Sequence, residues 1–270
     1  MTTASIPDYL GLTRLDGRGF VVLGAGQGIG EQASHALAQA GARLFCVDTV
    51  AERADAIARA VGGAAGVGDV TQRADVARLF AEARRSLGRV DGVVDIVGIA
   101  RIKPLADYSD EEWDGQFGIV LRHAFLTLQL GAAALAETGG GAMVFVGSMA
   151  GERAVPNQAA YGSAKAALHH LVRCAAGEFA AKGIRVNAVA PGFIRTPRLE
   201  ALLTAAQWRD IESHIPLGRA ASPAEIAATI LFLATDLSSH VTGHVLDVDG
   251  GVGNAAAIPQ IRWAPPKPAG

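Results

Sequence analysis

The stretch GFVVLGAGQGIGEQASHALAQAG, residues 19–41, joins an apolar run to a glycine-rich turn and then to an alanine-rich helical pattern. The apolar run shows no polar alternation, which predicts a strand that is buried on both faces. Glycines in such a turn allow backbone N–H groups at the start of the next helix to approach a phosphate, because no Cβ stands in the way. The stretch therefore predicts a strand, a phosphate-binding turn and a helix.

The rest of the chain repeats this alternation of apolar runs and longer helical patterns. Further strands are predicted over residues 42–48, 91–98, 141–148, 184–192 and 243–251, and helices over residues 28–40, 50–61, 72–87, 109–137, 157–182 and 222–235. This order predicts an α/β fold, a single doubly wound parallel sheet of about seven strands and of the Rossmann type, with helices on both faces. We expect one domain over residues 15–252 with a substrate lid at 193–218, an N-terminal extension at 1–14 and a proline-rich C-terminal tail at 253–270.

Composition narrows the kind of partner. The chain has 270 residues and a formal net charge of −2, so it offers no basic surface for nucleic acid or for an anionic membrane. No apolar run approaches the roughly 20 residues that cross a bilayer, and the first residues lack an export signal. Cys46 and Cys174 are expected to be buried thiols, and the adjacent His169 and His170 point apart on a helix and give no metal site. These features indicate a cytoplasmic protein that binds a small molecule.

An acidic residue at the end of the second strand bears on the identity of that molecule. Asp48 follows Gly24 by 24 residues, near the spacing at which an acid binds the adenosine ribose of a dinucleotide. A carboxylate there would repel a 2′-phosphate, and Arg53 is expected on a solvated helix face, so NAD is favoured over NADP. The alternative is that Asp48 only caps the helix that follows it.

The residues YGSAK, 161–165, place a phenol and an ammonium group one helical turn apart. Tyr161 is a weak base at neutral pH, and the charge of Lys165 would lower its pKa toward the working range. Ser148 ends the strand of residues 141–148, at the edge of a parallel sheet where ligands bind. Taken singly, the tyrosine could be a packing residue, the lysine a surface charge and the serine a helix cap. Together with a dinucleotide turn they predict a catalytic group.

With GAGQGIG (24–30), GDV (68–70), APGFIRT (190–196) and these three side chains, the sequence resembles the short-chain dehydrogenase/reductase family over about residues 15–252. The resemblance implies that Tyr161 exchanges a proton with the substrate oxygen, that Ser148 polarises that oxygen, and that Lys165 binds the nicotinamide ribose. It implies a larger set of coenzyme-binding residues: Gly24, Gln27, Gly28, Ile29, Gly30, Asp48, Asp69, Val70, Gly98, Tyr161, Lys165, Pro191, Gly192, Ile194 and Thr196.

Three positions depart from the family pattern. Leu23 stands where the family has threonine, and DIVG (95–98) stands where it has NNAG. Val120 occupies the place of the asparagine that holds a water in the proton path, and valine has no polar atom for that task. His123, one turn further on, either takes over a relay role or packs the helix. Two interpretations therefore compete: an enzyme with an altered relay, and a catalytically decayed scaffold or sensor that still binds the dinucleotide.

Two segments suggest a substrate and an assembly. The lid carries apolar residues among arginines, which favours a small apolar alcohol or ketone, with an acidic group as an option, although these side chains could simply pack the lid onto the domain. They are Phe193, Leu199, Leu202, Leu203, Trp208 and Ile211, with Arg195, Arg198 and Arg209. Further candidates for the pocket wall are Val97, Ile99, Met149 and Val155. The helix at 157–182 is apolar on more than one face, which predicts packing against another subunit, and the resemblance implies a homodimer or homotetramer. The sequence thus predicts an NAD-dependent oxidoreductase that interconverts a secondary alcohol and a ketone.

Overall fold

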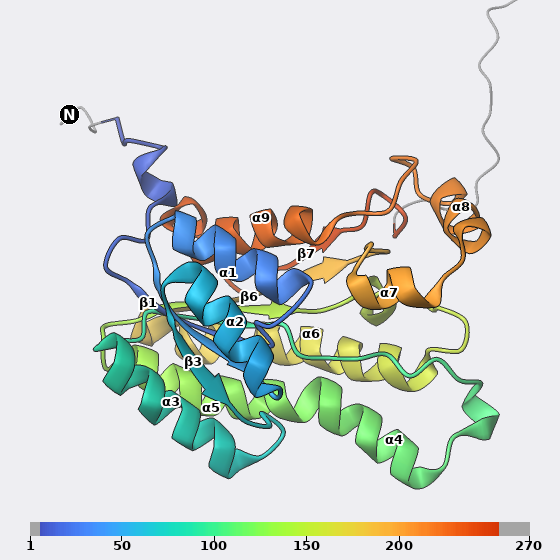
Figure 1. Ribbon diagram of the computed structural model, residues 1–270, viewed down its shortest axis with the longest axis horizontal. Coiled ribbons are helices and arrows are strands. Elements are labelled where there is room, and N and C mark those ends of the chain that lie inside the picture. Colours follow the sequence, from blue (N-terminus) through green and yellow to red (C-terminus); the bar gives the residue numbers. More distant parts are fainter. Residues whose placement is uncertain (1–5, 254–270) are drawn as a thin grey trace, which may run out of the picture.

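The computed structural model describes residues 6–253 and contains a seven-stranded parallel sheet with helices on both faces (Figure 1). The strands are β1 Gly19–Leu23, β2 Arg43–Asp48, β3 Ala64–Val67, β4 Gly92–Asp95, β5 Gly141–Val146, β6 Ile184–Pro191 and β7 Val245–Val248. Their order is β3-β2-β1-β4-β5-β6-β7, and every neighbouring pair is parallel. The predicted fold class is confirmed. Because the chain returns from the β3 edge to β4 beside β1, a crevice is expected at the carboxyl ends of β1 and β4.

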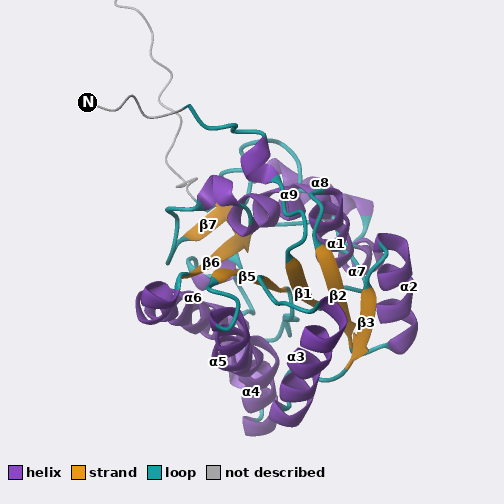
Figure 2. Cartoon of the chain, turned by 90° about the vertical axis from the view of Figure 1, so that its left-hand side faces the viewer, coloured by secondary structure: helices purple, strands orange, loops and turns teal. Residues whose placement is uncertain are grey.

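Residues of one strand face opposite layers of helices, which explains why the strands are apolar throughout. Phe20 and Val22 of β1 belong to one core cluster, and Val21 and Leu23 belong to the other. The helices are α1 Ile29–Gln39, α2 Ala51–Val61, α3 Arg73–Leu87, α4 Asp110–Phe117, α5 His123–Ala136, α6 Ala159–Phe179, α7 Pro197–Leu202, α8 Ala205–Ser213 and α9 Pro223–Ala234. Figure 2 shows α1, α2 and α9 on one face of the sheet and α3, α4, α5 and α6 on the other.

The predicted helix at 109–137 is one run with an interruption. A π-helical turn, Gly118–Arg122, separates α4 from α5. Within residues 6–253 the run Asp110–Ala136 is the single helix whose length and composition would allow it to cross a membrane, contrary to the expectation that no apolar run is long enough. However, 56% of its most apolar window is buried in the protein, and α5 packs on α3, α6, β4 and β5. It is therefore a core helix of the layer beneath the sheet.

The apolar faces of α6 are covered within the chain. The helix packs on β6 and also on α4, α5 and the π-turn. Of the eight apolar residues that suggested a subunit contact, Ala164, Leu168, Val172, Ala175 and Ala176 are buried, and Ala167, Leu171 and Phe179 are half-buried. Packing inside the chain therefore explains most of the apolar character of α6, and the three half-buried residues are the part that remains for a subunit contact. Cys46 is buried as expected, whereas Cys174, on the outer side of the same helix, is exposed.

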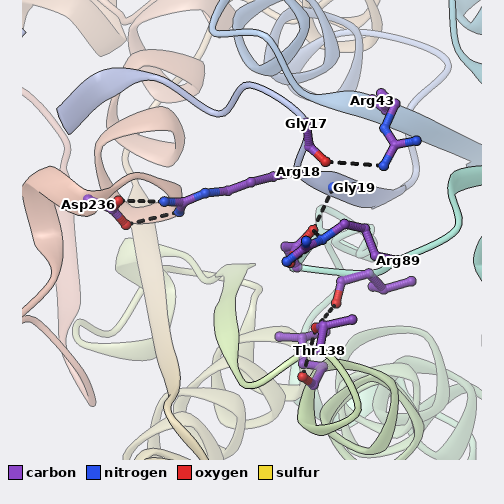
Figure 3. A network of polar contacts seen from close by, with 10 residues as sticks. Gly17, Arg18, Gly19, Arg43, Arg89, Thr138 and Asp236 are labelled. Carbon is purple, nitrogen blue, oxygen red and sulfur yellow. Dashed lines mark hydrogen bonds and ion pairs between the residues drawn. The ribbon is translucent and has the colours of Figure 1, made fainter. Parts of the chain in front are cut away.

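Polar contacts tie the loops together at the amino-terminal edge of the sheet (Figure 3). The Arg18 guanidinium donates to both carboxylate oxygens of Asp236, which follows α9. The buried Asp91 carboxylate accepts the backbone N–H of Gly19 at 2.8 Å and three bonds from the Arg89 guanidinium. These contacts join the segment before β1 to the loops before β4 and after α9, at the end of the sheet remote from the expected crevice.

The element boundaries differ in detail from the expectations. The strands end earlier, since β4 stops at Asp95 and β5 at Val146, and β3 was not specified as a strand range. Residues 6–14 contain only the short 3₁₀ turn Gly11–Thr13. Positions 1–5 of the expected extension, and all of the expected tail except Gly253, lie outside the described residues.

Candidate active site

The glycine turn after β1 packs closely against the end of β2 and against its own backbone. Gly24 N and Ala25 N both donate to Val47 O at 2.9 Å, which anchors the turn to β2. A Cβ on Gly30 would lie 1.9 Å from Gly24 O, and a Cβ on Gly26 would lie 2.5 Å from the Asp48 carboxylate. Gly28 precedes α1 with φ +61, a conformation that side-chain-bearing residues rarely adopt. The turn therefore exposes N–H groups at the start of α1, as a phosphate-binding site requires.

Asp48 holds two parts of this site in place. Its Oδ2 accepts the N–H of Gly26 at 3.1 Å, and its Oδ1 accepts the N–H of Val50 at 3.0 Å. The cap of α2 is Val50, without a side-chain cap bond, so Asp48 precedes the cap and holds its backbone N–H, and the capping alternative is wrong. Each carboxylate oxygen has a further lone pair, so the side chain can still accept from a ribose hydroxyl.

A cleft of about 320 Å³ lies along the glycine turn. It is lined by nine of the expected coenzyme residues: Gly24, Gln27, Gly28, Ile29, Asp48, Asp69, Val70, Gly98 and Thr196. Gly30, Tyr161, Lys165, Pro191, Gly192 and Ile194 do not line it. Val97 and Ile99 are on the wall, whereas Met149 and Val155 are not. The sequence reasoning missed the wall residues Val47, Thr49, Gly68, Ile96, Ile119, Pro197 and Arg198.

Arg53 also lines this cleft, although it was expected on a solvated helix face. Its side chain is exposed to solvent, and its Cβ lies 2.6 Å from the position of a Cβ on Gly26. The cation therefore stands at the same turn as Asp48. Arg53 is thus exposed to solvent as expected, and it also lines the cleft.

Ser148, Tyr161 and Lys165 come together beside the cleft. Tyr161 is half-buried near the start of α6, and Ser148 lies close enough to act on the pKa of its phenol. The buried Lys165 lies with its Nζ 5.7 Å from the Tyr161 ring centre, and it donates to Val146 O at 2.7 Å. A Cβ on Gly98, which lines the cleft, would lie 3.0 Å from that Nζ. Ser148 Oγ also accepts the N–H of Ala150, so it caps a short 3₁₀ turn as well.

The electrostatics of this group differ from the expectation. Burial raises the pKa of Tyr161 above its ordinary value, against the effects of the Ser148 side chain and the charge of Arg198. Burial lowers the pKa of Lys165 to about 8, and the Asp95 carboxylate acts in the opposite direction. In the protein alone, Arg198 is thus the cation that favours the phenolate, and this side chain comes from the lid.

Asp95 and His123 meet in one place. His123 Nδ1 lies 2.9 Å from Asp95 Oδ2, and both side chains are almost fully buried. Asp95 Oδ1 accepts the N–H of Val97 at 3.1 Å. Val120 is fully buried in the π-helical turn. His123 Nε2 has no hydrogen-bond partner among the described residues, so the imidazole has one polar contact, to Asp95.

The lid has its own small core. Trp208, Ile215 and Ala220 form a buried cluster against which most of the apolar lid residues pack, as the packing alternative held. Leu202 is the exception and is exposed. Arg195 pairs with Glu200 and Glu212 and stacks over Trp208 at 4.4 Å. Only Thr196, Pro197 and Arg198 bring this segment to the cleft. Among residues 6–253 no cluster of His, Cys, Asp and Glu suited to a metal ion occurs.

Comparison with known proteins places the chain among oxidoreductases. Residues 24–253 match the family model described as enoyl-(acyl carrier protein) reductase. A 3-oxoacyl-(acyl-carrier-protein) reductase of Thermotoga maritima is 36% identical, covering 88% of this chain and 99% of its own. Galactitol 2-dehydrogenase of Cereibacter sphaeroides is 37% identical over 90% and 98%. The cis-4-hydroxycyclohexanecarboxylate dehydrogenase of Sinomonas cyclohexanicum is 40% identical over 86% and 94%.

Solved structures agree with this assignment. A 7α-hydroxysteroid dehydrogenase complexed with NADH and 7-oxo glycochenodeoxycholic acid superposes with a TM-score of 0.85 at 34% identity, over 90% of this chain and 96% of that one. A short-chain type dehydrogenase/reductase of Mycobacterium marinum gives 0.84 at 35% identity, over 91% and 99%. The seven-stranded sheet, the glycine turn and the extent of these matches lead to one conclusion: the chain belongs to the short-chain dehydrogenase/reductase family of oxidoreductases.

Proposed function

We propose that the protein is an NAD-dependent dehydrogenase that interconverts a secondary alcohol and a ketone, with Ser148, Tyr161 and Lys165 as its catalytic residues. The supporting observation is the position of the Lys165 ammonium, which would lie 3.0 Å from a Cβ on Gly98 of the cleft wall and lies 5.7 Å from the Tyr161 ring centre, so that it joins the glycine-turn cleft to Tyr161 and Ser148. A Cβ on Gly28 would face Thr196 and Pro197 across the cleft, so the turn keeps the space at the start of α1 open and fits a pyrophosphate. NAD bound there would accept or supply the hydride.

The three side chains divide the remaining work. Tyr161 takes the proton of the substrate hydroxyl as the alcohol is oxidised, and returns it when the ketone is reduced. Ser148 donates a hydrogen bond to the same oxygen and so stabilises the charge that develops on it. Lys165 would bind the nicotinamide ribose, since its ammonium lies beside Gly98 of the cleft wall, and Arg198 is the cation that acts on the phenol.

NAD is proposed over NADP because Asp48 stands at the ribose end of the cleft with its charge fixed by two backbone bonds. Arg53 is the opposing influence, since a cation at the same turn would attract a 2′-phosphate. The carboxylate is the more rigidly held of the two groups, and Arg53 is free to extend into solvent. Discrimination against NADP is therefore expected to be incomplete.

The substrate is proposed to be a small, largely apolar alcohol or ketone that carries an acidic group. Ile96, Val97, Ile99 and Ile119 make the cleft wall apolar near Gly98, and Arg198 on the same wall is a cation that acts on the pKa of the reacting phenol. Relatives with related chemistry include an enzyme named for a hydroxycyclohexanecarboxylate. Replacing Arg198 with methionine is expected to raise KM for an acidic substrate more than for its neutral amide.

Other features of the proposal concern the whole protein. Residues 15–252 act as one catalytic domain with 193–218 as the lid, in a cytoplasmic homo-oligomer, a dimer or tetramer. Light scattering on the purified protein would test the oligomer, and a monomer at working concentration would refute it.

The rival proposal is a decayed scaffold that binds the dinucleotide without turnover. The two proposals are separated by following NADH absorbance with NAD and a panel of secondary alcohols, alongside calorimetric titration with NAD. The enzyme is expected to reduce NAD, and Tyr161→Phe to lose turnover while it retains binding. Binding of NAD with no turnover on any alcohol or, in reverse, on any ketone would favour the scaffold.

A further inference from the structure

A buried histidine lies behind the loop that carries Ser148. His169 is on α6, one turn after Lys165, and only 1% of its side chain is exposed. Its Nε2 lies 3.3 Å from the backbone N of Ser148, and its Nδ1 lies 3.0 Å from Glu152 Oε1. The imidazole therefore spans the loop between β5 and α6, from the proposed catalytic serine to an acid four residues later.

The loop is shaped to admit this ring. A Cβ on Gly147 would lie 2.2 Å from His169 Nε2, and a Cβ on Gly151 would lie 2.7 Å from His169 Cε1. Neither glycine has a positive φ that would explain its presence by conformation. Two glycines that flank Ser148 and the 3₁₀ turn thus leave the space that the imidazole occupies.

The hydrogen bonds assign one tautomer. A backbone N–H can only donate, so Nε2 must accept and carry no proton. The proton is then on Nδ1, which donates to the Glu152 carboxylate. A carboxylate that accepts from one ring nitrogen of a histidine fixes the tautomer and the orientation of the ring, and the other nitrogen can then accept a hydrogen bond.

We infer that His169 is a positioning residue, which accepts the N–H of Ser148 and, held by Glu152, fixes the serine hydroxyl relative to Tyr161. The inference rests on the proposed function of Ser148. Without the acceptor, the Ser148 amide has no partner at this site, and the serine loop can rotate the hydroxyl away from the phenol. A misplaced Ser148 hydroxyl lowers turnover more than it weakens coenzyme binding, because the coenzyme cleft is lined by other residues.

The charge state of the ring must match this role. Burial is the main cause that lowers the pKa of His169, and Lys165 and Arg173 act in the same direction, whereas Glu152 opposes them. Asp247 lies close enough to Glu152 for the two carboxylates to influence one another. The ring is thus neutral at pH 7, and acceptance by Nε2 is lost only when the pH falls through the lowered pKa.

The test compares His169→Leu, His169→Gln and the control His170→Leu, whose site is the exposed neighbour on the same helix. His169→Leu is expected to lower kcat about tenfold with KM for NAD unchanged, the effect of one lost hydrogen bond at a reacting group. The Gln amide oxygen can accept the Ser148 N–H and is expected to recover part of the loss. His170→Leu is expected to match the wild type. Equal kcat values for His169→Leu and the wild type would overturn the inference.

A second measurement does not depend on turnover. In the ¹⁵N-histidine spectrum of the wild-type protein at pH 7, His169 should show a protonated Nδ1 and an unprotonated Nε2, and His169→Leu should speed exchange of the Ser148 amide hydrogen. A protonated Nε2 would overturn the inference even if His169→Leu failed to fold. If no alcohol or ketone were turned over, the proposed function would fail, and the spectrum and amide exchange would still decide whether His169 holds Ser148.

Discussion

The buried pair of Asp95 and His123 is the departure from the family pattern with the largest predicted energetic consequence. The perturbation is His123→Leu, which removes the partner of Asp95 Oδ2 and leaves the carboxylate with one donor, the N–H of Val97 at Oδ1. The exposed fractions of the two side chains are 1% and 0%, so water does not replace the lost bond.

The expected loss of unfolding free energy for His123→Leu depends on whether Asp95 is left unpaired or keeps another hydrogen-bond partner. Removing one member of a buried pair costs about 3–5 kcal/mol, because the other charge stays buried without compensation. A lost hydrogen bond to a charged group costs about 1.5–3 kcal/mol when other partners remain. Since Asp95 retains the Val97 N–H, the value expected for His123→Leu is about 3 kcal/mol of unfolding free energy, where the two ranges meet.

The assay is a double-mutant cycle by urea denaturation at pH 7. Asp95→Asn with His123→Leu should be less destabilised than the sum of the single variants by about 2 kcal/mol, because an unpaired amide costs less to bury than an unpaired carboxylate. The exposed pair of Arg14 and Asp16 gives the control, since Asp16→Asn should change stability by less than about 0.5 kcal/mol. A loss below about 1 kcal/mol for His123→Leu, or strict additivity in the cycle, would refute the pairing argument.

Three further predictions follow from other contacts. Asp48→Ala should raise KM for NAD and lower KM for NADP, each about tenfold, and adding Arg53→Ala should cancel the gain with NADP; an unchanged NADP/NAD ratio in steady-state kinetics would exclude the assigned roles. Burial lowers the pKa of Lys165 from 10.5 in the unfolded chain to about 8 in the folded protein. Between pH 8 and pH 10.5 the amine is therefore protonated in the unfolded chain and neutral in the folded one, so the stability of the protein rises with pH over this range. Lys165→Met should therefore be more stable than the wild type at pH 7, with the advantage, up to about 3 kcal/mol, shrinking toward pH 10.5 in parallel denaturation curves; a difference independent of pH contradicts this. Asp91→Ala should cost about 2 kcal/mol of stability because the Gly19 N–H loses its acceptor, and a loss no greater than that of Asp16→Ala would contradict this reading.

The fold and the coenzyme side of the site were accessible from the sequence because their signals are local. Apolar runs without alternation identify strands buried on both faces, and a glycine turn between a strand and a helix needs only about a dozen residues to be recognised. The run from α4 to α5 was predicted as one helix because a π-helical turn inserts a residue without ending the helix. Nothing in the composition of Gly118–Arg122 marks the extra residue in the turn.

What the sequence could not provide is the set of contacts made across long separations. Arg53 was assigned to solvent because its helix face was judged without the preceding turn, which brings it to the cleft. Lys165 was expected to lower the pKa of Tyr161, but its own burial and the lid residue Arg198 change that balance. Burial is a property of the assembled fold, so neither shift can be derived from the spacing of residues along one helix.

The surroundings of Asp95 bear on whether the protein has lost its catalytic activity. A site that loses its function tends to lose residues one at a time, and an unmatched carboxylate at position 95 would then be a buried group without partners. Both oxygens of Asp95 instead have partners, since Oδ1 accepts from Val97 and Oδ2 lies 2.9 Å from His123 Nδ1. Position 95 is therefore a satisfied buried group, as buried polar groups of an intact site are expected to be. Asp95 also acts on Lys165, so the pair is linked to the proposed reaction: Asp95→Asn removes a charge that raises the Lys165 pKa, and the basic limb of the pH–rate profile should then move to lower pH. A profile that does not move would show that the pair serves packing alone.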